Sequence, residues 1–265
     1  MKRILLTVEY DGTAYAGWQR QINGLAVQQV MEEALASACG HPVSVTGSSR
    51  TDAGVHARMQ MVHFDTSCSI PPEKFPFALN NLLPPDIRVQ AAREVPADFH
   101  ARFLTSGKTY TYRILNSRHG SAMLRNTHWH IPVPLDVPAM REAISFLPGT
   151  HDFAAFQAAG GTARTTVRTL DRADLAVTGQ EITLVISGNA FLYNMVRIIA
   201  GTLAEAGLHR LKTDAFTRAF ASLNRLDLGM TAPAHGLELT EVRYPDQAFT
   251  DPEAIRWHRA GEEEE

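Results

Sequence analysis

Apolar residues in the first hundred positions follow the spacing of strands and of helices in turn. The β-branched and aromatic content of residues 3–10 predicts a strand, which the turn signal Asp11-Gly12 ends. Apolar positions three and four apart over residues 25–38 predict a helix that Gly40 caps. We expect further strands at 43–46, 59–64 and 87–94, and a short helix from the Pro71-Pro72 pair to Leu83.

The second half of the chain shows the same mixture. The pattern predicts strands at 108–115, 167–177, 181–187 and 237–244. It predicts helices at 137–147, 191–206 and 214–223. We therefore expect an α+β fold of two halves with mostly antiparallel sheets: residues 1–105, residues 106–245, and then an acidic, flexible tail over 246–265.

Composition fits a globular protein of the cytosol. Hydrophobic residues make up 45% of the 265 positions, and no apolar run approaches the roughly 18–20 residues of a membrane span. The first residues are interpreted as a strand and not as a secretory signal. Cys39 and Cys68 lie far apart in the sequence, which argues against a zinc ribbon or a disulfide framework and fits a reducing, cytoplasmic location.

The charge distribution leaves room for a nucleic-acid partner. The chain has a net charge of −3, but residues 246–265 alone carry −5, so the rest carries +2. Residues 50–125 contain ten basic and six acidic residues. A mildly basic face is one interpretation of this excess, and scattered surface arginines are an equally good one.

The segment Gly47-Ser-Ser-Arg-Thr-Asp-Ala-Gly-Val-His56 holds the strongest candidate for chemistry. It is predicted to form a tight loop between two strands, where catalytic groups are disproportionately found. An Asp beside glycine usually forms a turn, and that is the structural interpretation of Asp52. Arg50 lies two positions earlier and would share its side of an extended segment, holding the carboxylate ionised. An ionised, aimed Asp52 can act as a nucleophile or a general base.

Three further positions are candidates for substrate binding. Tyr110 and Tyr112 share one side of a predicted strand, where a flat ring can stack on an unpaired base or simply pack in the core, and core packing is favoured for Tyr112. Arg197 lies among apolar residues of a predicted helix, and it would either seek a carboxylate or phosphate or lie at the surface. Leu237 follows a Pro- and Gly-shaped loop and would line a pocket there. No histidine set has metal-ligand spacing and no phosphate-binding glycine motif occurs, so neither metal nor cofactor is expected.

Five ordered segments together resemble the bacterial tRNA pseudouridine synthase A (TruA) family. They are Val8-Glu-Tyr-Asp-Gly-Thr-Ala-Tyr-Ala-Gly-Trp-Gln-Arg-Gln21, the loop 47–56, Lys108-Thr-Tyr-Thr-Tyr-Arg113, Phe191-Leu-Tyr-Asn-Met-Val-Arg197 and Ala232-Pro-Ala-His-Gly-Leu-Glu-Leu239. The resemblance runs from about Leu5 to Tyr244 and leaves out the acidic end.

The resemblance implies a pseudouridine synthase fold whose two halves join into one extended mixed sheet with an active cleft between them. It implies a cytoplasmic homodimer that isomerises uridines 38, 39 and 40 of the tRNA anticodon stem-loop without metal or cofactor. Asp52 matches the family's catalytic aspartate, and Arg50, Tyr110, Arg197 and Leu237 match positions around it.

Two other functions remain open from the residues alone. One is an RNA-binding or chaperone module without catalysis, and the other is a carboxylate-dependent nucleoside hydrolase or glycosidase. A hydrolase usually needs a second carboxylate, and no acidic partner stands beside Asp52 in the sequence.

Overall fold

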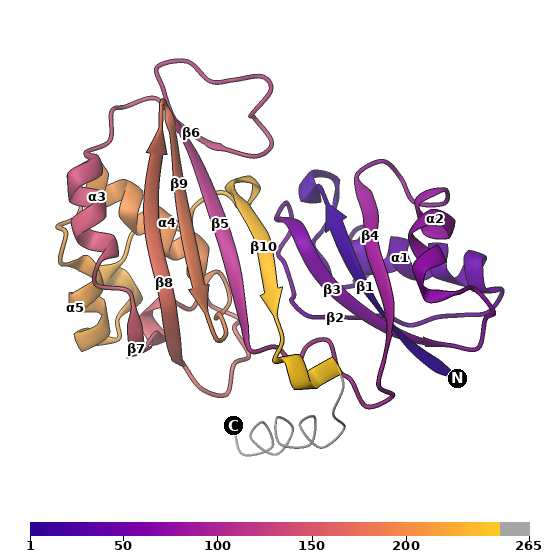
Figure 1. Cartoon of the computed structure of the whole chain (residues 1–265). Coiled ribbons are helices and arrows are strands. Elements are labelled where there is room, and N and C mark those ends of the chain that lie inside the picture. The colour runs from indigo at the N-terminus through magenta and orange to yellow at the C-terminus, as the bar shows by residue number, and fades with distance from the viewer. Residues whose placement is uncertain (250–265) are drawn as a thin grey trace. The chain divides into compact units, whose positions relative to one another are not determined.

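The computed structural model describes residues 1–249, which divide into two compact units (Figure 1). Unit 1 consists of Met1–Ser106 with the segment from Leu239 onward, and unit 2 consists of Gly107–Glu238. The closing strand was predicted in the C-terminal half, yet all but its first two residues belong to unit 1. Unit 1 is thus assembled from both ends of the sequence.

Unit 1 is an antiparallel sheet with two helices. Its strands follow the order β4-β1-β3-β10, with β2 paired to β3. The bounds are β1 Lys2–Tyr10, α1 Val27–Cys39, β2 Thr46–Gly47, β3 His56–Thr66, α2 Phe75–Asn80, β4 Ile87–Val95 and β10 Leu237–Arg243. Helix α2 contacts both α1 and β4. Helix α1 buries Val27, Met31, Ala34 and Leu35, and Gly40 caps it at φ 73° as the sequence predicted.

Unit 2 has the strand order β5-β9-β8-β7, with β6 paired parallel to β5 and the other pairs antiparallel. The bounds are β5 Gly107–Asn116, β6 Trp129–Ile131, α3 Val137–Ile144, β7 Gly149–Asp152, β8 Val167–Thr178, β9 Glu181–Gly188, α4 Met195–Gly207 and α5 Ala215–Ser222. Helices α3 and α4 contact each other and also contact β8 and β5 respectively. The expected α+β class with mostly antiparallel strands is confirmed.

Two predicted elements have different bounds for identifiable reasons. The strand expected over 43–46 is reduced to β2, because α1 side chains take the backbone groups of Val45: Gln28 Nε2 donates to its carbonyl at 3.1 Å, and Glu32 Oε1 accepts from its N–H at 3.3 Å. The helix expected from Phe191 begins four residues later, because Asn194 adopts a left-handed conformation at φ 62°. The short strands β6 and β7 were not predicted.

The predicted flexible tail differs at its first four residues. Asp246–Phe249 form a short 3₁₀ helix in which Ala248 is buried. The Phe249 ring stacks on Phe99 with centroids 5.7 Å apart, and the Arg93 guanidinium lies 3.5 Å from the same ring. The rest of that predicted tail, 250–265, lies outside the described residues.

Candidate functional site

The loop from Gly47 to His56 connects β2 to β3 in unit 1, as predicted. A turn shapes its centre, where the Val55 N–H donates to the Asp52 carbonyl at 3.1 Å and Gly54 adopts φ 78°. Exposure alternates along the preceding residues: Arg50 is exposed, Thr51 is buried and Asp52 is half-buried. The backbone therefore presents Asp52 at the surface while it anchors Thr51 in the core.

A buried glutamine holds the beginning of this loop. Gln60 is fully buried on β3, and its Oε1 accepts from the Ser48 hydroxyl at 2.8 Å and from the Ser49 N–H at 3.2 Å. Its Nε2 donates to the Ser49 carbonyl at 2.7 Å. The side-chain amide of Gln60 thus hydrogen-bonds both the N–H and the carbonyl of Ser49, which would otherwise need water as a partner.

The segment after β1 clamps the loop from its other side. The Tyr10 hydroxyl lies 2.7 Å from the Thr51 hydroxyl, and the Trp18 N–H donates to the Thr51 carbonyl at 3.0 Å. Trp18 itself is buried and stacks on Tyr10 with ring centroids 6.1 Å apart, so its side chain is part of the core of unit 1. The segment after β1 and the loop lie very close together. A Cβ on Gly17 would lie 2.6 Å from the Thr51 carbonyl oxygen, and a Cβ on Gly47 would lie 2.5 Å from the Trp18 ring.

The end of the loop is held by His56. Its Nδ1 accepts from the Gly12 N–H at 3.0 Å and lies 3.1 Å from a carboxylate oxygen of Asp11. Partial burial acts to raise the pKa of Asp11, but hydrogen bonds from Thr13 and the neighbouring His56 outweigh it, so the pKa lies below its usual value. An ionised Asp11 therefore flanks the loop that carries Asp52.

In unit 2, Tyr110 and Tyr112 lie on β5, and both are buried. Tyr110 packs edge-on against Phe191 at 5.0 Å between ring centroids. Tyr112 has the core role favoured for it: its hydroxyl donates to the Pro233 carbonyl at 2.8 Å, and burial raises its pKa. A Cβ on Gly236 would lie 2.9 Å from that hydroxyl, so the loop 233–236 rests directly on Tyr112.

Arg197 connects the start of α4 to the same loop. Its Nε donates to the Ala232 carbonyl at 2.8 Å, and its own carbonyl accepts from the Ala232 N–H at 3.0 Å. Its Nη1 donates to Asn194 Oδ1 at 2.7 Å. Leu237 follows this loop as the first residue of β10 and is buried. Unit 2 thus brings Arg197 next to the loop that leads to Leu237, although forty residues of sequence separate them.

Sequence reasoning missed the residues that fix the loops. Tyr10 and Asn194 make contacts described above, yet neither carries a signal in the one-dimensional pattern. Gln60 does carry one, because it is a polar residue between the apolar Met59 and Met61 of a predicted strand, and a buried amide requires partners.

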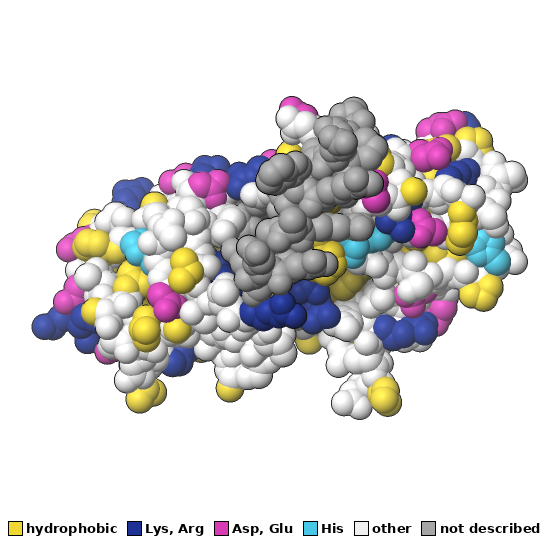
Figure 2. Space-filling view, turned by 90° about the horizontal axis from the view of Figure 1, so that it is seen from below, with side chains coloured by type: hydrophobic (Ala, Val, Ile, Leu, Met, Phe, Trp, Pro, Cys, Tyr) yellow, Lys and Arg dark blue, Asp and Glu magenta, His cyan; other side chains and the backbone are white. Residues whose placement is uncertain are grey.

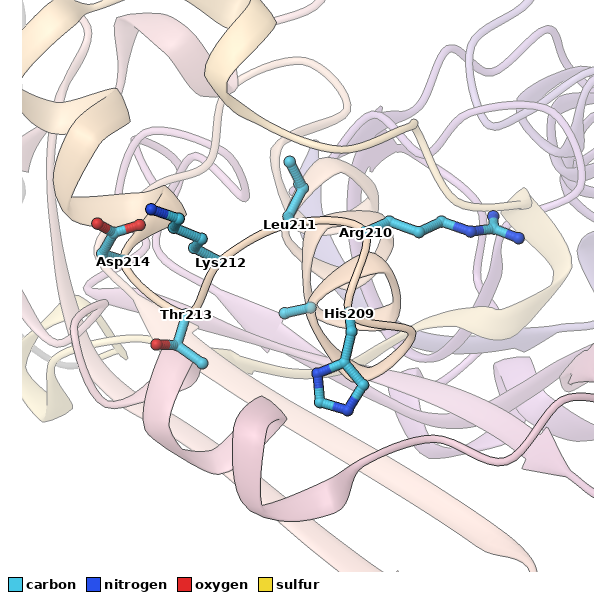
Figure 3. Close-up of a pocket in the computed structure, with 7 residues that line it drawn as sticks. His209, Arg210, Leu211, Lys212, Thr213 and Asp214 are labelled. Atoms are coloured by element: carbon cyan, nitrogen blue, oxygen red, sulfur yellow. The ribbon is translucent and has the colours of Figure 1, made fainter.

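A shallow hollow of about 430 Å³ lies elsewhere in unit 2, on the loop after α4 (Figure 3). Its lining includes His209, Arg210, Lys212 and Asp214, and none of the predicted site residues. Figure 3 shows Arg210 and Lys212 pointing in opposite directions, so these side chains do not converge on one ligand. This hollow therefore adds nothing to the candidate site.

Residues 1–249 show no metal-binding cluster and no membrane-spanning helix. On the face shown in Figure 2, acidic and basic side chains are interspersed. Residues 1–249 contain no group of three or more His, Cys, Asp or Glu side chains arranged to hold a metal ion. Within the same range, no helix is long and apolar enough to cross a membrane.

Comparison with known proteins gives a consistent result. The family described as "tRNA pseudouridine synthase" matches residues 6–104 and 143–245. The chain is 49% identical to "tRNA pseudouridine synthase A" of Ruminiclostridium cellulolyticum, over 92% of this chain and 100% of that protein. It is 45% identical to the protein of the same name from Acetivibrio thermocellus, again over 92% and 100%.

A solved structure, "Crystal Structure of a Cbf5-Nop10-Gar1 Complex", aligns over 89% of this chain and 48% of that one. Its TM-score is 0.37 and its identity 9%, a similarity too low to support an argument.

Proposed function

Because the chain belongs to the tRNA pseudouridine synthase family, we propose that it isomerises uridine in tRNA to pseudouridine with Asp52 as its catalytic residue. The observation that carries this proposal is the construction of the Asp52 loop. Gln60 holds its beginning, Tyr10 and Trp18 hold its centre and His56 holds its end. Contacts of this kind hold a reacting group in one geometry, so that little reorganisation is needed during the reaction.

The reaction breaks the bond between C1′ of the ribose and N1 of uracil, and it forms one between C1′ and C5. The proton on C5 leaves, and N1 gains one. The Asp52 carboxylate either adds to C6 of the ring or assists cleavage of the glycosidic bond and then takes the C2′ proton. Both routes need the nucleotide out of its stack, which costs a few kcal/mol.

The predicted substrate-binding residues have distinct parts in this proposal. Tyr110 stacks on the flipped base and accepts the C5 proton. Arg50, exposed on the same loop as Asp52, steers the carboxylate or fills the space that the base leaves. Arg197 favours the ionised form of Asp52, and Leu237 supplies an apolar wall. The substrate is the anticodon stem-loop of tRNA, the active form is a homodimer in the cytoplasm, and neither metal nor cofactor takes part.

Release of tritium from tRNA labelled at C5 of uridine tests the proposal. We expect the wild-type chain to release it, and Asp52→Asn to abolish release while it still binds tRNA. The matched control is Asp174→Asn, which changes an exposed carboxylate paired with Arg172 in unit 2 and should leave release unchanged. Normal release by Asp52→Asn would exclude the catalytic assignment.

The same experiment separates the two alternatives. Binding without tritium release from the wild-type chain would favour a binding module. Release of free uracil would favour a hydrolase. Sedimentation equilibrium tests the homodimer, and a monomer at micromolar concentration would contradict it.

A further inference from the structure

The two cysteines are far apart in the sequence but adjacent in unit 1. Cys39 is the last residue of α1, and Cys68 lies two residues after β3 ends at Thr66. The Cys68 N–H donates to the Thr66 hydroxyl at 3.1 Å, and both thiols also hydrogen-bond the Thr66 side chain. Each thiol is in turn a direct neighbour of the other. Thr66 therefore gathers both sulfur atoms at one place.

The two cysteines contact a buried threonine and are themselves partly exposed to solvent. Thr66 is fully buried, and its hydroxyl also lies 2.9 Å from His41 Nε2. Both cysteines are only half-buried, so a small solute can reach them. Lys2 is the residue opposite Thr66 in the pairing of β1 with β3, and its positive charge favours the thiolate form of both cysteines.

The two thiols differ in ionisation. Burial raises the pKa of Cys39 to about 11. Burial also acts to raise the pKa of Cys68, but hydrogen bonds from Thr66 and the Ile70 backbone outweigh it and bring the pKa below its usual value. The Cys68 thiol therefore ionises more readily than the Cys39 thiol beside it, an asymmetry that reactive cysteine pairs have.

We propose that Cys39 and Cys68 form a peroxide-sensitive dithiol that closes reversibly to an intramolecular disulfide. The Cys68 thiolate attacks one oxygen of hydrogen peroxide, breaks the O–O bond and becomes a sulfenic acid with loss of hydroxide. Cys39 then loses its proton and attacks the Cys68 sulfur, the S–S bond forms, and the hydroxyl leaves as water. Overall two thiols are oxidised, one peroxide is reduced and two waters form; an external dithiol reverses the change.

Closure would enclose the loop of Asp52 in a covalent ring. Residues 40–67, between the two cysteines, contain β2, the loop of Asp52 and β3. A disulfide across this segment restricts the unfolded chain and stabilises the fold. For a chain of this size we expect the melting temperature to rise by on the order of 5 °C.

The test treats the full-length reduced protein with hydrogen peroxide and measures intact mass, free thiols and disulfide-linked peptides. The chain has two cysteines, so only one intramolecular disulfide is possible. We expect a loss of two hydrogens, a Cys39–Cys68 cross-linked peptide, a higher melting temperature, and reversal by dithiothreitol. Wild-type protein unfolded in urea is the matched control, and it should form the same link more slowly.

Variants that each lack one cysteine show which thiol reacts first with peroxide. Cys39→Ser should accumulate a sulfenic acid at Cys68 that dimedone traps, and Cys68→Ser should leave Cys39 unmodified at the same peroxide concentration. Linked dimers alone, overoxidation of Cys68 with Cys39 still reduced, or intact thiols after treatment that oxidises free cysteine would each overturn the proposal. None of these readouts depends on RNA, so the result is independent of the proposed isomerase activity.

Discussion

The hydroxyl oxygen of Tyr10 lies 2.7 Å from the hydroxyl oxygen of Thr51, the residue directly before Asp52. Tyr10 ends β1 and Thr51 belongs to a loop forty residues later, so this buried hydrogen bond connects two separate parts of unit 1. It is one of the contacts that define where the backbone of Asp52 lies. Its removal should therefore affect catalysis as well as stability.

Tyr10→Phe removes only this hydroxyl. We expect a loss of about 1 kcal/mol in the free energy of unfolding, and a fall of about tenfold in isomerisation rate as the loop loosens. Tyr15→Phe is the matched control, because the Tyr15 hydroxyl donates at 2.7 Å to Asp86 and not to the loop of Asp52. It should lose similar stability and keep its rate, as measured by urea unfolding and tritium release. Equal isomerisation rates in the two variants would show that the Tyr10 hydroxyl does not hold the loop in place.

Gly17→Ala adds a methyl group where there is no room for one. Gly17 has φ 99°, and the new Cβ would lie 2.6 Å from the Thr51 carbonyl oxygen. Gly40→Ala is the control, because Gly40 has φ 73° and no atom within 4 Å of its added Cβ. We expect Gly40→Ala to lose about 1 kcal/mol from backbone strain with normal activity, and Gly17→Ala to lose at least about 2 kcal/mol more, together with activity. Similar unfolding midpoints for the two variants would contradict the close approach seen here.

Gln60→Leu tests the buried amide. The change leaves the N–H and carbonyl of Ser49 without the partner that Gln60 provides, at a cost of about 2–4 kcal/mol. Gln90→Leu is the control, since Gln90 is exposed and donates to the Glu9 side chain. That variant should stay within about 0.5 kcal/mol of the wild type. Chemical denaturation measures both, and a small effect at Gln60 would show that the loop start finds other partners.

His63 should make stability depend on pH. Burial, followed by the nearby His100 and Arg3, lowers its pKa to about 4, and its Nδ1 accepts from the Ala101 N–H at 3.1 Å. Between pH 6.5 and 4 the unfolded chain binds a proton that the folded chain does not, so stability is full above pH 6.5 and falls as pH drops. The loss over this window is about 3 kcal/mol at most.

His63→Asn keeps an acceptor near the Nδ1 position and cannot take up that proton. The difference in unfolding free energy between pH 7 and pH 5 should therefore shrink in this variant. The exposed His119, changed to Asn, serves as the control and should retain the wild-type slope. An unchanged slope in His63→Asn would mean that other groups carry the acid sensitivity.

Regular spacing of buried residues made most of the fold predictable. The repeat of Val27, Met31 and Leu35 marks α1, and Gly40 marks its end. The pattern failed where a local conformation or a side chain overrode it. Asn194 delays α4, and α1 side chains take the backbone groups of Val45. Neither effect is visible as hydrophobic periodicity.

The site was predictable to a different degree. Composition and spacing singled out the loop of Asp52, but assigning it a role depended on the resemblance of five segments together. Contacts such as Tyr10 with Thr51 arise from pairing across forty residues, which a one-dimensional pattern does not encode. The same holds for Cys39 and Cys68, which the sequence presents as unrelated and Thr66 brings together.

The discontinuity of unit 1 sets an order for biosynthesis. Gly107–Glu238 forms an uninterrupted unit, whereas unit 1 includes β10, and the Ser106 N–H donates to the Arg243 carbonyl at 2.9 Å. A ribosome releases the N-terminal residues of unit 1 long before it adds Arg243. The strand β3 adjoins β10 and follows the loop of Asp52. The part of its edge that β2 does not cover therefore stays unpaired while more than a hundred residues are added. An edge strand that lacks its partner is open to wrong pairing, so the nascent chain is most vulnerable to misassociation in this interval.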